Sequence, residues 1–274
     1  MVRSQLPVAI LAIEGTNCDR ELAVGLRTLG TRPEVVHLKQ FAGEVDTPAR
    51  RRLSDYGALF LPGGFSAGDY VRAGAILAAR VRASIGAELE EFVRSGRLVA
   101  GICNGFQVAI ELGLHPGRPG GRLGAAEAAL IANDSGRFEC RPTFVAWTGG
   151  HFPPLDGVPA GKRYLFPSAH GEGKLVLAGG AARRRELERD GQLLFRWVAP
   201  DGGPATYPWN PNGSEGDAAG LTNPEGNVFG LMPHPERSFF QAQAPDWSRG
   251  GSPQGFGDGK EFLERVVRYA ERHG

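Results

Sequence analysis

The sequence predicts an α/β fold: an open, mostly parallel sheet with helices on both faces, plus a small antiparallel portion. Three observations predict it. Short all-apolar runs are typical of buried parallel strands, amphipathic segments alternate with them at short spacing, and the middle of the chain is rich in strand signals but poor in helix signals. With 274 residues the chain has an ordinary length for one α/β unit, so we expect residues 1–274 to form a single domain.

The first part of the chain alternates between strand and helix signals. Apolar runs predict strands at Val8–Ile13, Glu34–Leu38, Ala58–Leu61 and Leu98–Ile102. Helices are predicted at Asp19–Leu29 with Gly30 as its C-cap, from about Tyr70, around Ala87–Arg94 and at Phe106–Leu112. Helices that connect parallel strands pack back onto the sheet, so this order places helices on both of its faces.

The later part of the chain has a different pattern. Strands with little helix between them are predicted at Arg137–Trp147, Arg163–Phe166, Lys174–Ala178 and Leu193–Val198. This arrangement indicates an antiparallel layer or edge. The earlier pattern resumes at Asn227–Met232, and Glu261–His273 has the apolar spacing of an amphipathic helix.

Glycine is unusually frequent, with 41 residues in 274, which is about twice the usual ~7%. The glycines have no period, which excludes a collagen-like chain. The excess indicates loops and tight approaches of the backbone to a ligand. Three Gly/Pro-rich stretches are expected to be surface loops and not domain linkers, namely Leu114–Gly124, Gly149–Gly161 and Ala242–Gly259.

Composition and charge exclude several classes of function. The 31 Lys and Arg residues against 30 Asp and Glu lack the basic excess that binding to nucleic acid requires. No apolar run approaches the ~20 residues that span a bilayer, and the first residues lack a signal-peptide pattern. The three dispersed cysteines indicate a reducing compartment. We therefore expect a soluble, cytoplasmic protein with neither a nucleic-acid nor a membrane partner.

The strongest chemical signal is the point where a buried strand ends at Cys103 and a helix begins within two residues. Gly101 and Gly105 flank the cysteine at i−2 and i+2, as in the G-x-S-x-G nucleophile elbow with Cys in place of Ser. The helix N-terminus favours a thiolate, and the N–H of Asn104 could stabilise an oxyanion. The alternative is a structural cysteine beside a chance pair of glycines, but the position between strand and helix favours a nucleophile.

A second signal is the segment Gly230–Arg237, which follows another predicted strand. His234 lies between two prolines that stiffen the loop, and Glu236 follows two residues later. A carboxylate in this position can orient an imidazole and stabilise its protonated form, as the acid of a catalytic triad does. A lone histidine in a Pro-rich loop is more often incidental, and its pairing with the elbow favours a catalytic role.

The third signal is a glycine-rich loop after the strand Ala58–Leu61, with Gly63, Gly64 and Gly68. A glycine N–H in this loop would supply a second oxyanion donor. The rival interpretation is a phosphate cradle, but neither G-x-G-x-x-G nor G-x-x-x-x-G-K-[ST] occurs. No spacing of His, Cys and Asp fits a zinc site, so no metal is predicted. Cys18 and Cys140 are expected to be small buried hydrophobes or inert thiols.

These three segments, in this order, resemble the class I glutamine amidotransferases, a triad family that hydrolyses glutamine to supply ammonia on a flavodoxin-like α/β fold. Across nearly the whole chain, further segments are similar to the glutaminase subunits of phosphoribosylformylglycinamidine synthase, a ligase of purine biosynthesis. These segments are residues 15–19, 62–75, 101–107, 133–141, 169–173, 212–214 and 232–237. The departures are Glu14 in place of the usual Pro and the longer Gly/Pro-rich stretches.

The resemblance implies a role for each matching residue. Cys103 would be the nucleophile, His234 the base and Glu236 its partner. Gly63, Gly64 and Asn104 would line the oxyanion and substrate site. Gln107 would help to fix the glutamine, and His170 would border the pocket or the interface with a partner.

The resemblance also implies partners for this chain. Ammonia would pass through an internal channel to a large synthetase subunit, with a small bridging subunit completing the complex. Because this chain lacks an ATP motif, no cofactor is expected here, and ATP and magnesium are expected on the synthetase. Two alternatives remain open: a cysteine hydrolase of related architecture, such as a peptidase or deglycase, and a non-catalytic scaffold subunit.

Overall fold

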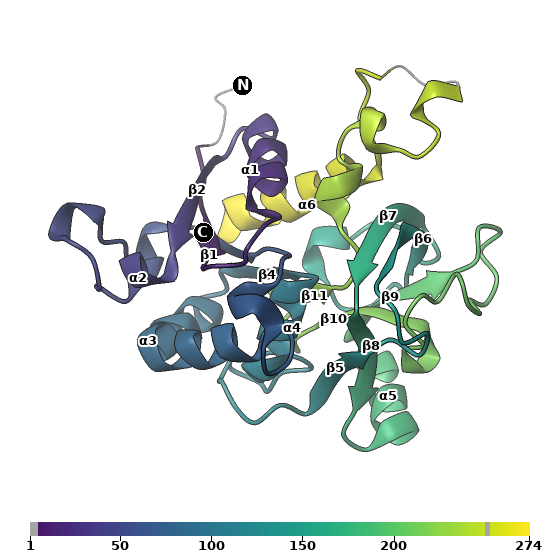
Figure 1. Cartoon of the computed structure of the whole chain (residues 1–274), viewed down its shortest axis with the longest axis horizontal. Coiled ribbons are helices and arrows are strands. Elements are labelled where there is room, and N and C mark those ends of the chain that lie inside the picture. The colour runs from purple at the N-terminus through teal and green to yellow at the C-terminus, as the bar shows by residue number, and fades with distance from the viewer. Residues whose placement is uncertain (1–4, 250–252) are drawn as a thin grey trace.

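A nine-stranded mixed sheet runs through the computed structural model, which describes residues 5–249 and 253–274 (Figure 1). In spatial order its strands are β2 (Arg32–His37), β1 (Pro7–Ala12), β3 (Ala58–Leu61), β4 (Leu98–Ile102), β11 (Val228–Leu231), β10 (Ala218–Thr222), β9 (Leu193–Val198), β6 (Glu139–Trp147) and β7 (Arg163–His170). Pairing is parallel from β2 to β11 and antiparallel from β11 to β7. A separate antiparallel pair joins β5 (Ala128–Ala132) to β8 (Glu172–Leu177).

Helices cover both faces of the parallel part, as predicted (Figure 1). The helices are α1 (Asp19–Thr28), α2 (Leu38–Phe41), α3 (Ala75–Arg94), α4 (Asn104–Glu111), α5 (Gly180–Arg189) and α6 (Asp258–His273). Alternate residues of each strand point to opposite layers. Val8 and Ile10 of β1 belong to the core that includes α1 and α6, whereas Ala9 and Leu11 belong to the core that includes α3. The predicted fold class is therefore confirmed.

Three elements of the later part of the chain were not predicted. Strand β5 and the central strand β10, with the sequence Ala-Ala-Gly-Leu-Thr, were both missed, and β10 has no aromatic residue and a single β-branched one, Thr222, to mark it as a strand. Helix α5 buries only Leu187, so it has no apolar stripe to reveal it, and the expectation of little helix in this region is wrong there. The two helical stretches predicted between residues 70 and 94 are one helix, α3, with a non-helical conformation at Ile85.

The Gly/Pro-rich stretches are mostly irregular, but they are not confined to the surface. Within the stretch at 149–161, Phe152 and Leu155 are buried in the core. The stretch at 242–259 includes residues 250–252, which lie outside the described residues. In the part of the chain that the structure describes, no helix combines the length and the apolar character needed to cross a membrane.

Candidate active site

The predicted site residues meet at one edge of the sheet. Strands β1, β3, β4 and β11 lie next to one another in this order and are all parallel. The segments that follow them therefore leave the sheet at the same edge, where the strands end. The packing is close: a Cβ placed on Gly63 would lie 2.7 Å from His234 Cε1 and 2.8 Å from Cys18 Sγ. The loops after β1, β3 and β11 therefore touch around one imidazole.

Cys103 occupies the sharp turn between β4 and α4 and has φ 53° and ψ −106°. A positive φ is uncommon for a residue with a side chain and has to be imposed by the surroundings. The N–H of Cys103 donates to the carbonyl of Leu231 (2.7 Å), and its own carbonyl accepts from the N–H groups of Phe106 (3.0 Å) and Gln107 (3.1 Å). These bonds clamp the cysteine between β11 and the first turn of α4.

The flanking glycines have the function that the elbow pattern predicts. A Cβ on Gly105 would lie 1.8 Å from the carbonyl oxygen of Leu61, and a Cβ on Gly101 would lie 2.7 Å from that of Gly105. Only glycine lets α4 approach the end of β3 and β4 this closely. The sequence pattern therefore reflected backbone contacts, which is why it located the turn correctly.

His234 and Glu236 form a buried pair, each about 1% exposed, with Nδ1 of the imidazole 2.6 Å from Oε1 of the carboxylate. Burial opposes a charge on the ring, but Glu236, Cys103 and Cys18 outweigh it and raise the pKa of His234 well above 6.5. The other ring nitrogen, Nε2, has no hydrogen-bond partner among the described residues. An imidazolium with one free N–H beside a thiol is the arrangement of a cysteine nucleophile and its acid–base partner.

Two backbone N–H groups are candidates to receive an oxyanion. Within the described chain, the N–H groups of Gly64 and Asn104 donate no hydrogen bond. Gly64 has a φ of +148°, which favours glycine. The Asn104 side chain ties the two loops together, since its Oδ1 accepts from the N–H of Ser66 at 3.2 Å.

Gln107 and His170 lie beside this cluster with most of their hydrogen-bonding groups already engaged. The Gln107 amide accepts from Asn104 Nδ2 (2.9 Å) and donates to the carbonyl of Glu172 (2.6 Å). Burial, together with the charge of His234, lowers the pKa of His170 to about 3, so this ring is neutral. Contact of either residue with a substrate stays a prediction.

Cys18 is part of the site, and the sequence interpretation missed it. Its Sγ accepts from Nη2 of Arg237 at 3.0 Å and lies against His234. Burial raises the pKa of the Cys18 thiol despite the opposing effects of His234 and Arg237. The available signal was topological, because Cys18 follows β1 at the edge where the other strands end. Cys140, by contrast, is exposed, so it is not a buried hydrophobe.

Cys18, His234 and Glu236 also form the one group among the described residues that could hold a metal ion, with ligand atoms within 4.8 Å of one another. Two contacts oppose this use. The guanidinium of Arg237 already lies on the Cys18 sulfur, and the Nδ1 to Oε1 contact of 2.6 Å occupies both of those donors. The geometry fits acid–base chemistry better than coordination.

Comparison with known proteins agrees with this geometry. Residues 5–270 match the family described as the CobB/CobQ-like glutamine amidotransferase domain. The chain belongs to this glutamine amidotransferase family. It is 44% identical to the phosphoribosylformylglycinamidine synthase subunit PurQ of Archaeoglobus fulgidus, over 99% of this chain and 100% of that one. It is 42% identical to the PurQ subunit of Picrophilus torridus, over 85% of this chain and 88% of that one.

A solved structure also matches the fold of this chain. The structure of PurLQS from Thermotoga maritima matches with a TM-score of 0.71 at 31% identity, over 97% of this chain and 99% of that one. Membership of the amidotransferase family gives the elbow, the buried imidazole and the free N–H groups a common chemistry. A thiolate can attack an amide carbon, the N–H groups can hold the oxyanion, and the imidazolium can protonate the leaving nitrogen.

Proposed function

We propose that this chain is the glutaminase subunit of a phosphoribosylformylglycinamidine synthase. It hydrolyses glutamine to glutamate and ammonia, and the ammonia passes to a synthetase subunit that converts formylglycinamide ribonucleotide to formylglycinamidine ribonucleotide with ATP. The observation that carries the proposal is Cys103, held at an elbow with a positive φ and interacting with His234 of the buried pair His234 and Glu236. Relatives of nearly the same length bear the name of that subunit.

In the first half of the reaction the Cys103 thiolate attacks the side-chain amide carbon of glutamine. The carbonyl oxygen becomes an oxyanion held by the N–H groups of Gly64 and Asn104, a kind of donor worth about 3–4 kcal/mol of barrier each. His234 gives its Nε2 proton to the nitrogen as the C–N bond breaks. Ammonia leaves, and a γ-glutamyl thioester remains on Cys103.

In the second half a water molecule attacks the thioester while His234, now neutral, takes a proton from it. The C–S bond breaks, glutamate is released, and the thiolate and imidazolium are restored. Glu236 stabilises the imidazolium in both halves through its contact with Nδ1.

The proposal includes partners for this chain. The solved relative from Thermotoga maritima is named PurLQS, and we infer a large synthetase subunit and a small bridging subunit for this chain also. ATP and magnesium belong to the synthetase in this proposal. Four exposed apolar side chains, which we call the apolar rim, lie next to the loop that carries Gly64: Phe65, Tyr70, Val71 and Phe138. The rings of Phe65 and Phe138 are 6.0 Å apart, so the rim joins two separate loops.

Replacement of Cys103 by alanine tests the proposed function. In the complex, Cys103→Ala should reduce glutamine-dependent synthesis by more than about 10³-fold, because the nucleophile is lost, while ammonia-dependent synthesis stays intact. The exposed Cys140 offers a matched control, and Cys140→Ala should leave both activities unchanged. Glutamine use that survives Cys103→Ala, or peptide cleavage without glutaminase activity in the wild type, would contradict the proposal.

A further inference from the structure

Asn133 is a buried residue directly after β5, and its side-chain amide and backbone N–H make five hydrogen bonds. Its Oδ1 accepts from the N–H of Gly173 and from Nδ1 of His170, both at 3.1 Å. Its Nδ2 donates to the carbonyls of Arg137 (2.9 Å) and His170 (2.8 Å), and its backbone N–H donates to that of Gly171 (2.9 Å). Four of these five bonds hold residues 170–173, where β7 ends and β8 begins; with Ala169 these residues form what we call the 169–173 turn.

The 169–173 turn contacts the catalytic cluster. The carbonyl of Ala169, at its start, accepts from the Cys103 Sγ at 3.4 Å. The carbonyl of Glu172 accepts from Gln107 Nε2 at 2.6 Å, and its carboxylate accepts from the N–H of Ala73 at 3.1 Å. A shift of the 169–173 turn would therefore move the surroundings of the sulfur and of the first turn of α4 together.

The amide of Asn133 also determines which nitrogen of His170 carries the proton. Because Nδ2 donates to two carbonyls, the orientation of the amide is fixed and Oδ1 faces His170. An acceptor at this position selects the Nδ1–H form of the neutral ring. The lone pair of Nε2 is then buried, and it has no partner within the described residues.

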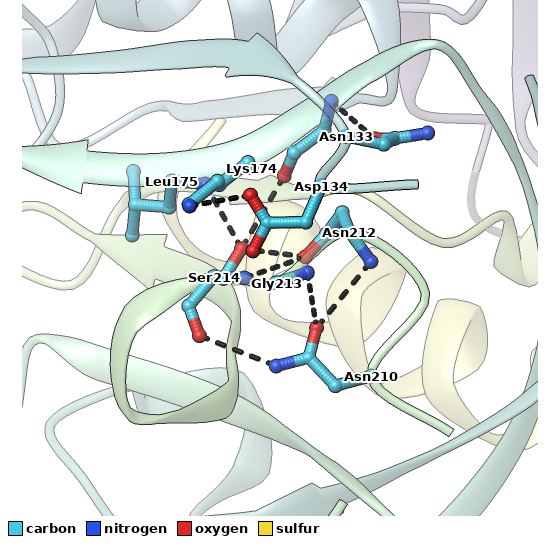
Figure 2. A network of polar contacts seen from close by, with 9 residues as sticks. Asn133, Asp134, Lys174, Leu175, Asn210, Asn212, Gly213 and Ser214 are labelled. Carbon is cyan, nitrogen blue, oxygen red and sulfur yellow. Dashed lines mark hydrogen bonds and ion pairs between the residues drawn. The ribbon is translucent and has the colours of Figure 1, made fainter. Parts of the chain in front are cut away.

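Asn133 and the residue after it belong to a network of polar contacts, which Figure 2 shows. The next residue, Asp134, forms an ion pair with Lys174 (2.6 Å), and its backbone N–H donates to the carbonyl of Asn212 (3.2 Å). Asn212 in turn accepts from the N–H of Ser214 at 3.0 Å. Segments around residues 134, 174 and 213 are thus joined next to Asn133, and these contacts restrain its position.

We propose that Asn133 is a positioning residue for the hydrolysis of glutamine. It holds the 169–173 turn against Cys103 and Gln107. It also keeps His170 in the Nδ1–H tautomer, in which the buried Nε2 is a hydrogen-bond acceptor. The inference rests on the proposed function, which supplies the reaction, and it goes beyond it by assigning a role to a residue that does not touch the reacting atoms.

Asn223 provides a matched control for the kinetic test. It is equally buried and its Oδ1 accepts from the N–H groups of Asn227 (3.0 Å) and Val228 (2.8 Å), but it precedes β11 and so lies at the opposite edge of the sheet. In the complex, Asn133→Ala should lower kcat about 10- to 100-fold with a smaller change in KM, because reacting groups are misplaced. Asn223→Ala should lower stability to a similar extent and leave kcat unchanged.

A measurement on the wild type completes the test without any variant. Nitrogen-15 NMR of histidine-labelled protein should show His170 protonated at Nδ1 and unprotonated at Nε2 at neutral pH. A proton on Nε2, or a kcat of Asn133→Ala equal to that of Asn223→Ala, would overturn the inference. If instead the wild-type complex failed to hydrolyse glutamine, the proposed function itself would fall, so the two failures are distinguishable.

Discussion

The charge on His234 is stabilised first by Glu236, in a buried site. Burial alone would lower the pKa of this histidine, and the carboxylate at 2.6 Å, together with Cys103 and Cys18, reverses that effect. The folded-state pKa therefore lies above the unfolded value of 6.5. The pair stabilises the folded protein fully below that value, and the stabilisation is lost as the pH rises through the folded-state pKa.

Glu236→Gln should remove this pH-dependent stabilisation. We expect the variant to lose more free energy of unfolding at about pH 6, below the unfolded value, than at a pH above the folded-state pKa, where the wild-type imidazolium has itself lost its proton. Urea denaturation of both proteins at each pH measures the difference. A deficit that stays constant with pH, or grows toward alkaline pH, would contradict the assignment of a charged pair.

Residues whose neighbours restrict the backbone could be identified from the sequence alone. Glycines flank Cys103 and prolines flank His234, so the local sequence pattern identified both residues without knowledge of their contacts. No such flanking pattern surrounds Cys18 or Asn133. Their contacts with Arg237 and His170 join positions 219 and 37 residues apart, so only the folded arrangement reveals them.

Helix α4 carries the free N–H of Asn104, and its position depends on close contact with β3. The contact point is Gly105, where a Cβ would lie 1.8 Å from the carbonyl oxygen of Leu61. A side chain there has to push the helix away from the sheet, and with it the N–H group that would hold the oxyanion.

Gly105→Ala should destabilise the protein by about 1–3 kcal/mol and lower glutaminase activity. Gly86 in α3 is a matched control, because its nearest contact for a new Cβ is 3.4 Å away at the end of the Leu123 side chain. Gly86→Ala should be neutral or stabilising by up to about 1 kcal/mol, as alanine is the better helix former. Urea denaturation separates the two, and equal stability of both variants would contradict the close packing of α4.

Elements with strong local patterns were predicted within a few residues, and elements fixed by tertiary context were not. The apolar runs of β3, β4 and β9 coincide with the observed strands. Strand β10 begins with three small residues, Ala218 to Gly220, and is a strand because it lies between β11 and β9. In the antiparallel extension the sequence thus located β9 and β6, whose residues carry the strand pattern, but missed β10 between β11 and β9.

At the scale of the whole molecule, the site lies where the two kinds of pairing meet. Cys103 and His234 follow β4 and β11 of the parallel part, whereas the 169–173 turn belongs to β7 and β8 beyond the antiparallel strands. The parallel part supplies the groups that react, and the antiparallel part supplies the turn against which they rest. Because strand order in the antiparallel part is not readable from periodicity, the sequence could not place this turn.

The apolar rim is the part of the surface where docking would act on the chemistry. Tyr70 is 89% and Val71 is 69% exposed, which is unusual for large apolar side chains, and both follow the loop of Gly64 closely. That loop includes three successive residues with positive φ, and for the two that are not glycine, Ala67 and Asp69, this backbone conformation is uncommon. A synthetase subunit that covered the rim would exclude water from the point where ammonia is released.

Tyr70→Gln should therefore weaken binding of the synthetase subunit about 10-fold or more, as loss of an aromatic anchor at an interface does. Val24, which is 46% exposed on α1, lies in the helix layer that includes α6 and serves as the control. Val24→Gln should leave the affinity unchanged. Titration of the synthetase with each labelled variant measures the dissociation constant, and circular dichroism verifies that both fold. Wild-type affinity in Tyr70→Gln would place the interface elsewhere, because a fully covered tyrosine cannot be replaced by a polar side chain without cost.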